Sequence, residues 1–168
     1  MSGPAQSRTY QAHIVLTGVR GVKTPVEVTD ETVGSVRYRP AGKTRPRLIL
    51  DCHIVEVLAA RGKAIRTAGV ATFHWSSSLR YTYRKGTKTL SQHAHGLALD
   101  IVAIDGDFGY ATVRGNYEKG VTGCGENNQG PKSGAMRKLA CARWIRTRRI
   151  RSRGYCDSPA SPSRSGTG

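Results

Sequence analysis

Residues 79–104 read LRYTYRKGTKTLSQHAHGLALDIVAI, and this stretch carries most of the fold prediction. The first six residues, 79–84, alternate apolar or aromatic side chains with arginine or threonine, which is the period-two pattern of a half-buried strand. The last eight, 97–104, form an apolar run of strand length that is interrupted by Asp100. We therefore predict that residues 79–84 and 97–104 are strands of one small antiparallel sheet.

Residues 48–61 (LILDCHIVEVLAAR) carry the clearest helical signal, because apolar side chains recur there at helical spacing, and Gly62 is expected to end the helix. Further strands are expected at residues 10–16, 26–28, 33–38, 64–75 and 110–114, and a short helix at 135–145. The predicted fold class is α+β, with a small antiparallel sheet and the 48–61 helix packed on it.

The length of 168 residues suits one ordinary domain. We expect strands and loops in residues 1–47, the main domain in residues 48–142, and a disordered basic tail in residues 143–168. Lysine and arginine exceed aspartate and glutamate by 16, and half of this excess lies in residues 137–168. Such a distribution indicates either a solvated tail or a polyanionic partner. No apolar run has membrane-spanning length, and the N-terminus lacks the layout of a signal peptide.

Four cysteines are present, at positions 52, 124, 141 and 156, and none forms a CxxC pair. This spacing argues against a structural zinc site of the ribbon or finger type. Three disulfide pairings are conceivable, of which we prefer Cys124 with Cys141, because it would close a loop rich in glycine and asparagine.

The segment SQHAHGLALD, residues 91–100, holds the residues that could carry chemistry. His93 and Asp100 are suitable zinc ligands, and Gly96 would let the backbone turn between them. A carboxylate in so apolar a strand is costly unless a cation meets it, and a metal would supply that cation. The alternative is a surface loop with incidental histidines, followed by a strand whose aspartate pairs with an arginine.

The pattern S-x-H-x-x-G-x-A-x-D resembles the signature of the zinc D-alanyl-D-alanine carboxypeptidase and hedgehog-like clan of metallopeptidases. The surrounding sequence is similar to the bacterial extensin-like C-terminal domain over about residues 48–142. This resemblance implies a hedgehog-like or D-Ala-D-Ala-peptidase-like fold, zinc-dependent hydrolysis of peptidoglycan peptides, and export to the cell envelope.

The resemblance also implies roles for individual residues. His93 and Asp100 match the first two zinc ligands, and Ser91 matches the residue that supports the ligand loop. Arg84 matches the arginine that faces the carbonyl or terminal carboxylate of the substrate, a role that suits a guanidinium. Near position 83, where the family usually has cysteine, this chain has tyrosine. That difference leaves a free Cys52 as one alternative.

The chain departs from the family pattern at the third zinc ligand, which in the clan is a histidine near the C-terminus. The last histidine here is His95, and an H-x-H pair on extended backbone points to opposite sides. His74 is the best substitute for the third ligand. We therefore expect an incomplete zinc site that binds the metal weakly, in a chain whose C-terminal part is truncated or frame-shifted from about residue 139.

Three functions follow from these observations. The first is a zinc-metallopeptidase-like domain of cell-wall type, with peptidoglycan or a cell-wall peptide as its partner. The second is a catalytically inactive cell-wall-binding or remnant domain. The third, ranked last because aromatic residues are few, is nonspecific nucleic-acid binding through the basic tail. We expect a monomer in each case.

Overall fold

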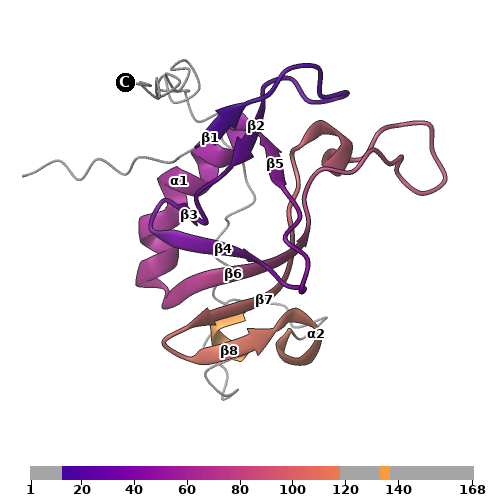
Figure 1. The fold of residues 1–168 in the computed structure, drawn as a ribbon. Helices are drawn as coiled ribbons and strands as arrows, with labels where there is room; N and C mark the ends of the chain where they lie inside the picture. The colour runs from indigo at the N-terminus through magenta and orange to yellow at the C-terminus, as the bar shows by residue number, and fades with distance from the viewer. Residues whose placement is uncertain (1–12, 118–132, 137–168) are drawn as a thin grey trace, which may run out of the picture.

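The computed structural model describes residues 13–117 and 133–136 of the chain, which form two β-sheets with one long helix beside them (Figure 1). The predicted α+β class is therefore confirmed. None of the helices in the described ranges is long and apolar enough to cross a membrane.

The smaller sheet contains β1 (His13–Val15), β2 (Pro25–Val28) and β5 (Leu48–Asp51), paired antiparallel in the order β1-β2-β5. Val26 lies opposite Leu50 and Val28 opposite Leu48, and all four side chains are buried. Glu27, between the two valines, points to the other face because side chains alternate along a strand. The sheet thus buries one apolar face.

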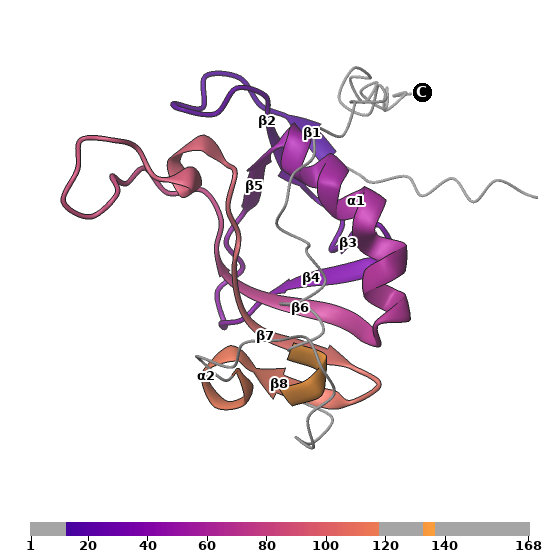
Figure 2. The same cartoon turned by 180° about the vertical axis from the view of Figure 1, so that it is seen from behind.

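The larger sheet has the order β3-β4-β6-β7-β8. Its strands are β3 (Thr32–Val33), β4 (Val36–Pro40), β6 (Val70–Ser77), β7 (Asp100–Gly106) and β8 (Gly109–Thr112). The prediction of an antiparallel sheet is wrong for one pair of strands, because β4 and β6 are parallel. Between them the chain makes β5 and α1 (Cys52–Thr67), and a crossover of that length is what a parallel pair requires (Figure 2).

The predicted helix at 48–61 is displaced in the structure. Residues 48–51 pair with β2 as strand β5, and α1 begins at Cys52, where the Asp51 carboxylate caps it by accepting from the backbone N–H of His53. The helix continues through Gly62 to Thr67. Gly62 does not end the helix but brings it close to the β3–β4 turn, because a Cβ at this position would overlap the carbonyl oxygen of Gly34. Gly69, at φ 86°, makes the turn into β6.

The predicted strand at residues 79–84 is wrong. Within the described residues this segment makes only one isolated bridge, Tyr83 with Leu90, and residues 80–89 are exposed. The reason is that β7 pairs directly with β6, with Asp100 opposite Ser77, so the chain between these two strands loops outward. This loop ends in a short 3₁₀ helix, η1 (Gln92–His95).

The remaining expected elements are present with different bounds. The strand expected at 26–28 is β2 (Pro25–Val28), and the one expected at 64–75 is β6 (Val70–Ser77), because α1 continues to Thr67. The strand expected at 33–38 splits into β3 and β4 at a turn where Gly34 and Ser35 both have positive φ. The edge strand expected at 110–114 is present as β8, followed by the short helix α2 (Val113–Asn116). Residues 133–136 are helical, and the rest of the helix expected at 135–145 lies outside the described residues.

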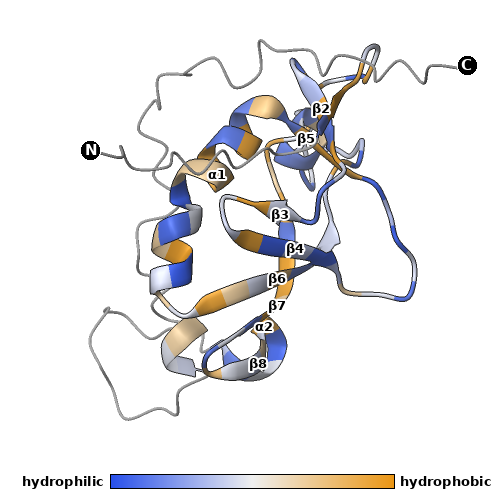
Figure 3. Cartoon of the chain, turned by 60° about the vertical axis from the view of Figure 1, so that its left-hand side comes forward, coloured by the Kyte–Doolittle hydropathy of each residue, from blue (hydrophilic) through white to orange (hydrophobic). Residues whose placement is uncertain are grey.

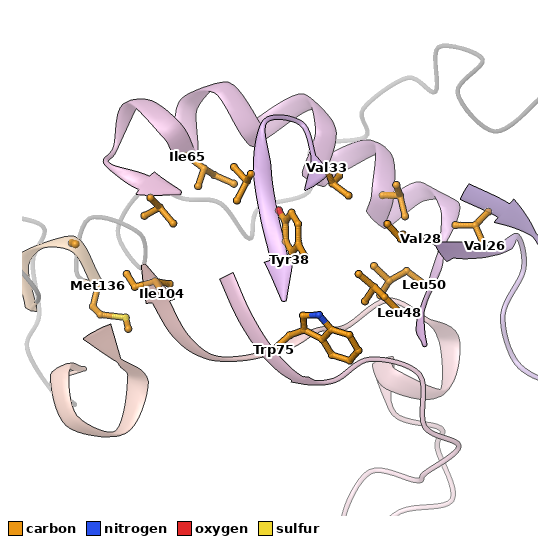
Figure 4. Close-up of a cluster of buried hydrophobic side chains, with 14 of the residues drawn as sticks. Val26, Val28, Val33, Tyr38, Leu48, Leu50, Ile65, Trp75, Ile104 and Met136 are labelled. Carbon is orange, nitrogen blue, oxygen red and sulfur yellow. The ribbon is translucent and has the colours of Figure 1, made fainter. Parts of the chain in front are cut away.

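The hydrophobic core lies between the two sheets and α1 (Figure 4). α1 alternates hydrophobic and hydrophilic segments along its length, as packing on one side requires (Figure 3). Tyr38 and Trp75 place large rings in the core, and each is 2% exposed. The smaller core residues fill the space around them; among them are Val26, Val36, Leu50, Val55, Val70 and Ile104.

Cys52, at the first position of α1, is buried and disulfide-bonded. This corrects the alternative of a free Cys52. The other three cysteines, and with them the preferred Cys124–Cys141 pairing, lie outside the described residues.

The described strands before residue 48 pair with strands after it: β2 with β5, and β4 with β6. The described parts of the segments 1–47 and 48–142 therefore share both sheets. The expected basic tail, residues 143–168, lies outside the described residues.

Candidate metal centre

The loop that carries His93 is shaped by a serine at one end and a glycine at the other. Ser91 caps η1, because its hydroxyl oxygen accepts a hydrogen bond from the backbone N–H of Ala94. The same hydroxyl lies 2.9 Å from that of Thr82. Gly96 ends η1 in the left-handed region, at φ 67°, as expected for the residue that turns the chain toward Asp100.

The loop is fixed to the rest of the fold by backbone contacts. The carbonyl oxygen of Gly96 accepts from the Asp51 N–H at 2.9 Å, and a Cβ at Gly96 would lie 2.7 Å from that same nitrogen. The side chain of His95 donates from Nδ1 to the carbonyl oxygen of Gly21 at 2.8 Å. Ala94, between these anchors, is fully buried. The position of His93 is therefore set by the start of α1 and by the loop before β2.

The imidazole of His93 is held in one orientation by a backbone carbonyl. Its Nδ1 lies 2.6 Å from the carbonyl oxygen of Ser78, and its Nε2 lies 3.1 Å from Oδ1 of Asp100. Because a carbonyl can only accept, Nδ1 carries the hydrogen and donates it. Nε2 is then the nitrogen available to a metal or a proton. Metal-binding histidines are commonly oriented by such a second contact.

Asp100 joins His93 to an arginine that the sequence motif does not contain. Its Oδ2 accepts from Nη2 of Arg80 at 3.0 Å, while Oδ1 faces His93. The His93 side chain is 12% exposed, whereas those of Asp100 and Arg80 are 43% and 52% exposed. The three residues thus form a chain from a buried imidazole to a solvent-facing guanidinium.

The space between Nε2 and Oδ1 needs a positive charge. A deprotonated Nε2 and a carboxylate oxygen both present lone pairs, so a proton or a cation must lie between them. Two atoms bound to one zinc ion at roughly 2.0–2.2 Å are about 3.3–3.6 Å apart at the ideal tetrahedral angle, and the observed 3.1 Å is slightly shorter than that. A separation increase of a few tenths of an ångström would therefore let His93 and Asp100 occupy two positions of a metal site.

No third ligand accompanies them in the described residues, where no group of three or more histidine, cysteine, aspartate or glutamate side chains could hold a metal. His74 lies opposite Ala103 in the sheet, three positions along β6 from the residue that faces Asp100, or about 10 Å along the strand. Its ring packs edge-on against Tyr110 at 5.2 Å. The structure does not bring His74 to the pair.

Burial lowers the pKa of His74, with the negative charge of Asp105 opposing that shift and the positive charge of Arg39 adding to it. His74 is therefore favoured in its neutral form by its packing against β8, away from the metal pair.

Arg84, the expected substrate arginine, lies in the exposed turn of the long loop. Its backbone N–H donates to Thr89, and its carbonyl oxygen accepts from Thr87. Arg80, four residues earlier, is the arginine that contacts Asp100, and sequence reasoning did not select it. The sequence indicates this contact only through the alternative interpretation of residues 91–100, in which the aspartate pairs with an unspecified arginine. No sequence feature indicates that the Ser78 carbonyl contacts His93, because every residue type has a backbone carbonyl.

Comparisons of the chain with family models, with curated proteins and with solved structures returned no match. The motif and the geometry around it are therefore the grounds on which a function can be proposed.

Proposed function

We propose that this chain is a zinc-metallopeptidase-like domain of cell-wall type, in which His93 and Asp100 are two ligands of an incomplete zinc site. The observation that supports it is the orientation of His93: its Nδ1 is committed to the Ser78 carbonyl, and its Nε2 lies 3.1 Å from Asp100 Oδ1. The hedgehog-like fold, the peptidoglycan peptide as substrate and export to the cell envelope are parts of the same proposal.

The chain's own residues would act as follows. Zinc held by His93 and Asp100 would supply Lewis-acid activation of water for the hydrolysis of a peptide bond. His93 presents Nε2, because Ser78 fixes the ring. Asp100 presents Oδ1, and Arg80 fixes the carboxylate through Oδ2. The exposed guanidinium of Arg84 is available for a substrate carboxylate, which it can bind through two parallel hydrogen bonds.

The site should bind zinc weakly. Catalytic zinc sites use three protein ligands, and this chain has no histidine after His95 to complete the set. Arg80 opposes the metal further, because its positive charge already partly neutralises Asp100.

The proposal is tested by measuring zinc binding and peptidoglycan hydrolysis in one preparation. We expect one weakly bound zinc per chain in the wild type and in the control His53→Ala, whose histidine lies on the exposed side of α1. We expect no such binding in His93→Ala. Zinc-dependent release of muropeptides that disappears in His93→Ala supports the peptidase, whereas equal zinc binding by all three proteins contradicts it.

The second candidate is an inactive cell-wall-binding or remnant domain. The observation that favours it is the ion pair between Arg80 and Asp100, which satisfies the carboxylate without a metal. This function predicts that the wild type sediments with purified sacculi, that chelator leaves this unchanged, and that no fragments are released. Zinc-dependent fragment release contradicts it.

A further inference from the structure

Two exposed loops, residues 16–24 and 79–91, meet beside the His93 loop and form a surface that we name the two-loop surface (Figures 1 and 2). Contacts far apart in sequence hold them together. Arg20 places its guanidinium 4.2 Å from the ring centroid of Tyr81, and Gly21 accepts the hydrogen bond of His95. The surface is thus built by the fold, although both loops are exposed.

The charge of the two-loop surface has a single sign. The two segments contain six lysines and arginines and no aspartate or glutamate. All six are exposed: Arg20, Lys23, Arg80, Arg84, Lys85 and Lys88. Arg80 is neutralised by Asp100, whereas the structure gives Lys23, Lys85 and Lys88 no ion pair with any described residue. A positive field of this kind favours a polyanionic partner.

Aromatic rings stand between these positive charges. Tyr83 is 55% exposed and Tyr81 is 40% exposed, although tyrosine rings are usually packed against other side chains. Their centroids are 6.1 Å apart in an edge-to-face arrangement, so the rings present two differently oriented flat surfaces. Arg20 covers one face of Tyr81, whereas no described cation lies over Tyr83. Tyr83 can therefore accept a flat partner.

We propose that the two-loop surface binds single-stranded nucleic acid, with phosphates on its lysines and arginines and a base stacked on Tyr83. Exposed aromatic rings interleaved with positive charge are the combination by which proteins bind single strands without sequence preference. An acidic glycan or polyphosphate would use the charges but would have no base to stack on Tyr83. The two-loop surface shares Arg80 and Arg84 with the proposed zinc site, but binding to it requires neither zinc nor the tail at residues 143–168.

The test uses the full chain and two fluorescent oligomers of the same length, an oligothymidylate and its abasic counterpart, so that phosphates are matched and bases are not. Tyr83→Ala should weaken oligothymidylate binding about tenfold, the loss of one base–aromatic stack. It should leave binding of the abasic oligomer unchanged. The matched control is Tyr117→Ala, which removes a ring of similar exposure (46%) elsewhere on the molecule and should change neither.

The charges are tested with a pair of double variants that alter the net charge equally. Lys85→Glu with Lys88→Glu should weaken binding of both oligomers. It should also make the slope of log K against log salt concentration less steep by about 1.4, as expected for two lost phosphate contacts on a single strand. Lys43→Glu with Lys63→Glu, outside the two-loop surface, should have a smaller effect on both quantities.

Four results would overturn the inference. Equal effects of Tyr83→Ala and Tyr117→Ala would remove the stacking step. Equal effects of the two charge variants would assign binding to net charge alone. An abasic oligomer that binds as tightly as oligothymidylate would show that no base is recognised. A soluble acidic cell-wall glycan that displaces bound oligothymidylate at a lower concentration than unlabelled oligothymidylate does would identify a different partner.

Discussion

At the scale of single residues, the candidate site depends on a backbone carbonyl as much as on side chains. Ser78 determines which nitrogen of His93 faces Asp100, and Arg80 determines which oxygen of Asp100 is free. The motif predicted the approach of His93 to Asp100, but it could not predict these two contacts. A carbonyl has no residue-type signal, and Arg80 was assigned to a strand that the structure does not contain.

Replacing Arg80 with glutamine should strengthen zinc binding about fivefold, which is the size expected for removing one exposed ion pair. The reason is that glutamine can still donate a hydrogen bond to Oδ2 of Asp100 but does not neutralise the carboxylate. Calorimetric titration with zinc measures the change. Weaker binding in Arg80→Gln would show instead that the charge of Arg80 is needed to hold Asp100 in place.

Replacing Gly96 with alanine should lower the free energy of unfolding by about 3 kcal/mol, because a positive φ is strained for alanine and the Cβ would crowd the Asp51 nitrogen. Gly86→Ala is the matched control. Gly86 also has a positive φ, 74°, but nothing lies within 4 Å of its Cβ position, so it should cost only about 1 kcal/mol. Urea denaturation compares the two variants, and equal losses would contradict the close contact at Gly96.

At the scale of elements, the contact between α1 and the β3–β4 turn explains why the helix has a glycine in its interior. Gly62 and Gly34 allow the backbone of α1 and that of the β3–β4 turn to touch. The sequence pattern placed the helix end at Gly62 because glycine usually ends helices, and tertiary packing overrode that tendency.

Replacing Gly62 with alanine tests this contact. Alanine favours a helix interior by about 1 kcal/mol over glycine, so helix propensity alone predicts stabilisation. The overlap with Gly34 should reverse the sign and give a net loss of about 2 kcal/mol or more. Lys63→Ala, at the exposed next position, should change the free energy of unfolding by under about 0.5 kcal/mol. A stabilised Gly62→Ala protein would contradict the packing of α1.

His74 on β6 packs against Tyr110 on β8. We expect the free energy of unfolding to depend on pH through this histidine, because burial lowers its pKa. A histidine whose folded pKa lies below its unfolded value, about 6.5, binds fewer protons when folded. Its contribution to stability is therefore present above that value and is lost as pH falls through the folded pKa. His74→Phe should become more stable relative to the wild type between pH 7 and pH 5, as measured by urea denaturation at several pH values. A difference that does not depend on pH would contradict the lowered pKa of His74.

At the scale of the whole molecule, local patterns predicted the class of the fold better than its topology. The strand expected at 26–28 and the one expected in the apolar run 97–104 are present as β2 and β7, and both contribute buried side chains to a single core. The run at residues 48–51 was assigned to the helix, since a short apolar segment suits either structure and only its pairing with β2 decides. The parallel pairing of β4 with β6 is a long-range contact that no local pattern encodes.

Cys52, at the start of α1, is disulfide-bonded. Peptide mapping of the protein alkylated without reduction should recover the Cys52 peptide linked to a peptide that contains Cys124, Cys141 or Cys156. Recovery of Cys52 in alkylated form from protein that was never reduced would contradict the disulfide. The linked peptide also identifies the pairing.

The central claim is that His93 presents Nε2 to a metal shared with Asp100, and nitrogen NMR of the histidine side chains tests it most directly. The spectrum is recorded above the ordinary histidine pKa of about 6.5, before and after zinc addition. The account predicts that Nδ1 of His93 carries the hydrogen in both states, and that zinc shifts its Nε2 resonance but not those of His53. A His93 with the hydrogen on Nε2 and a bare Nδ1, or one unaffected by saturating zinc, would contradict the account.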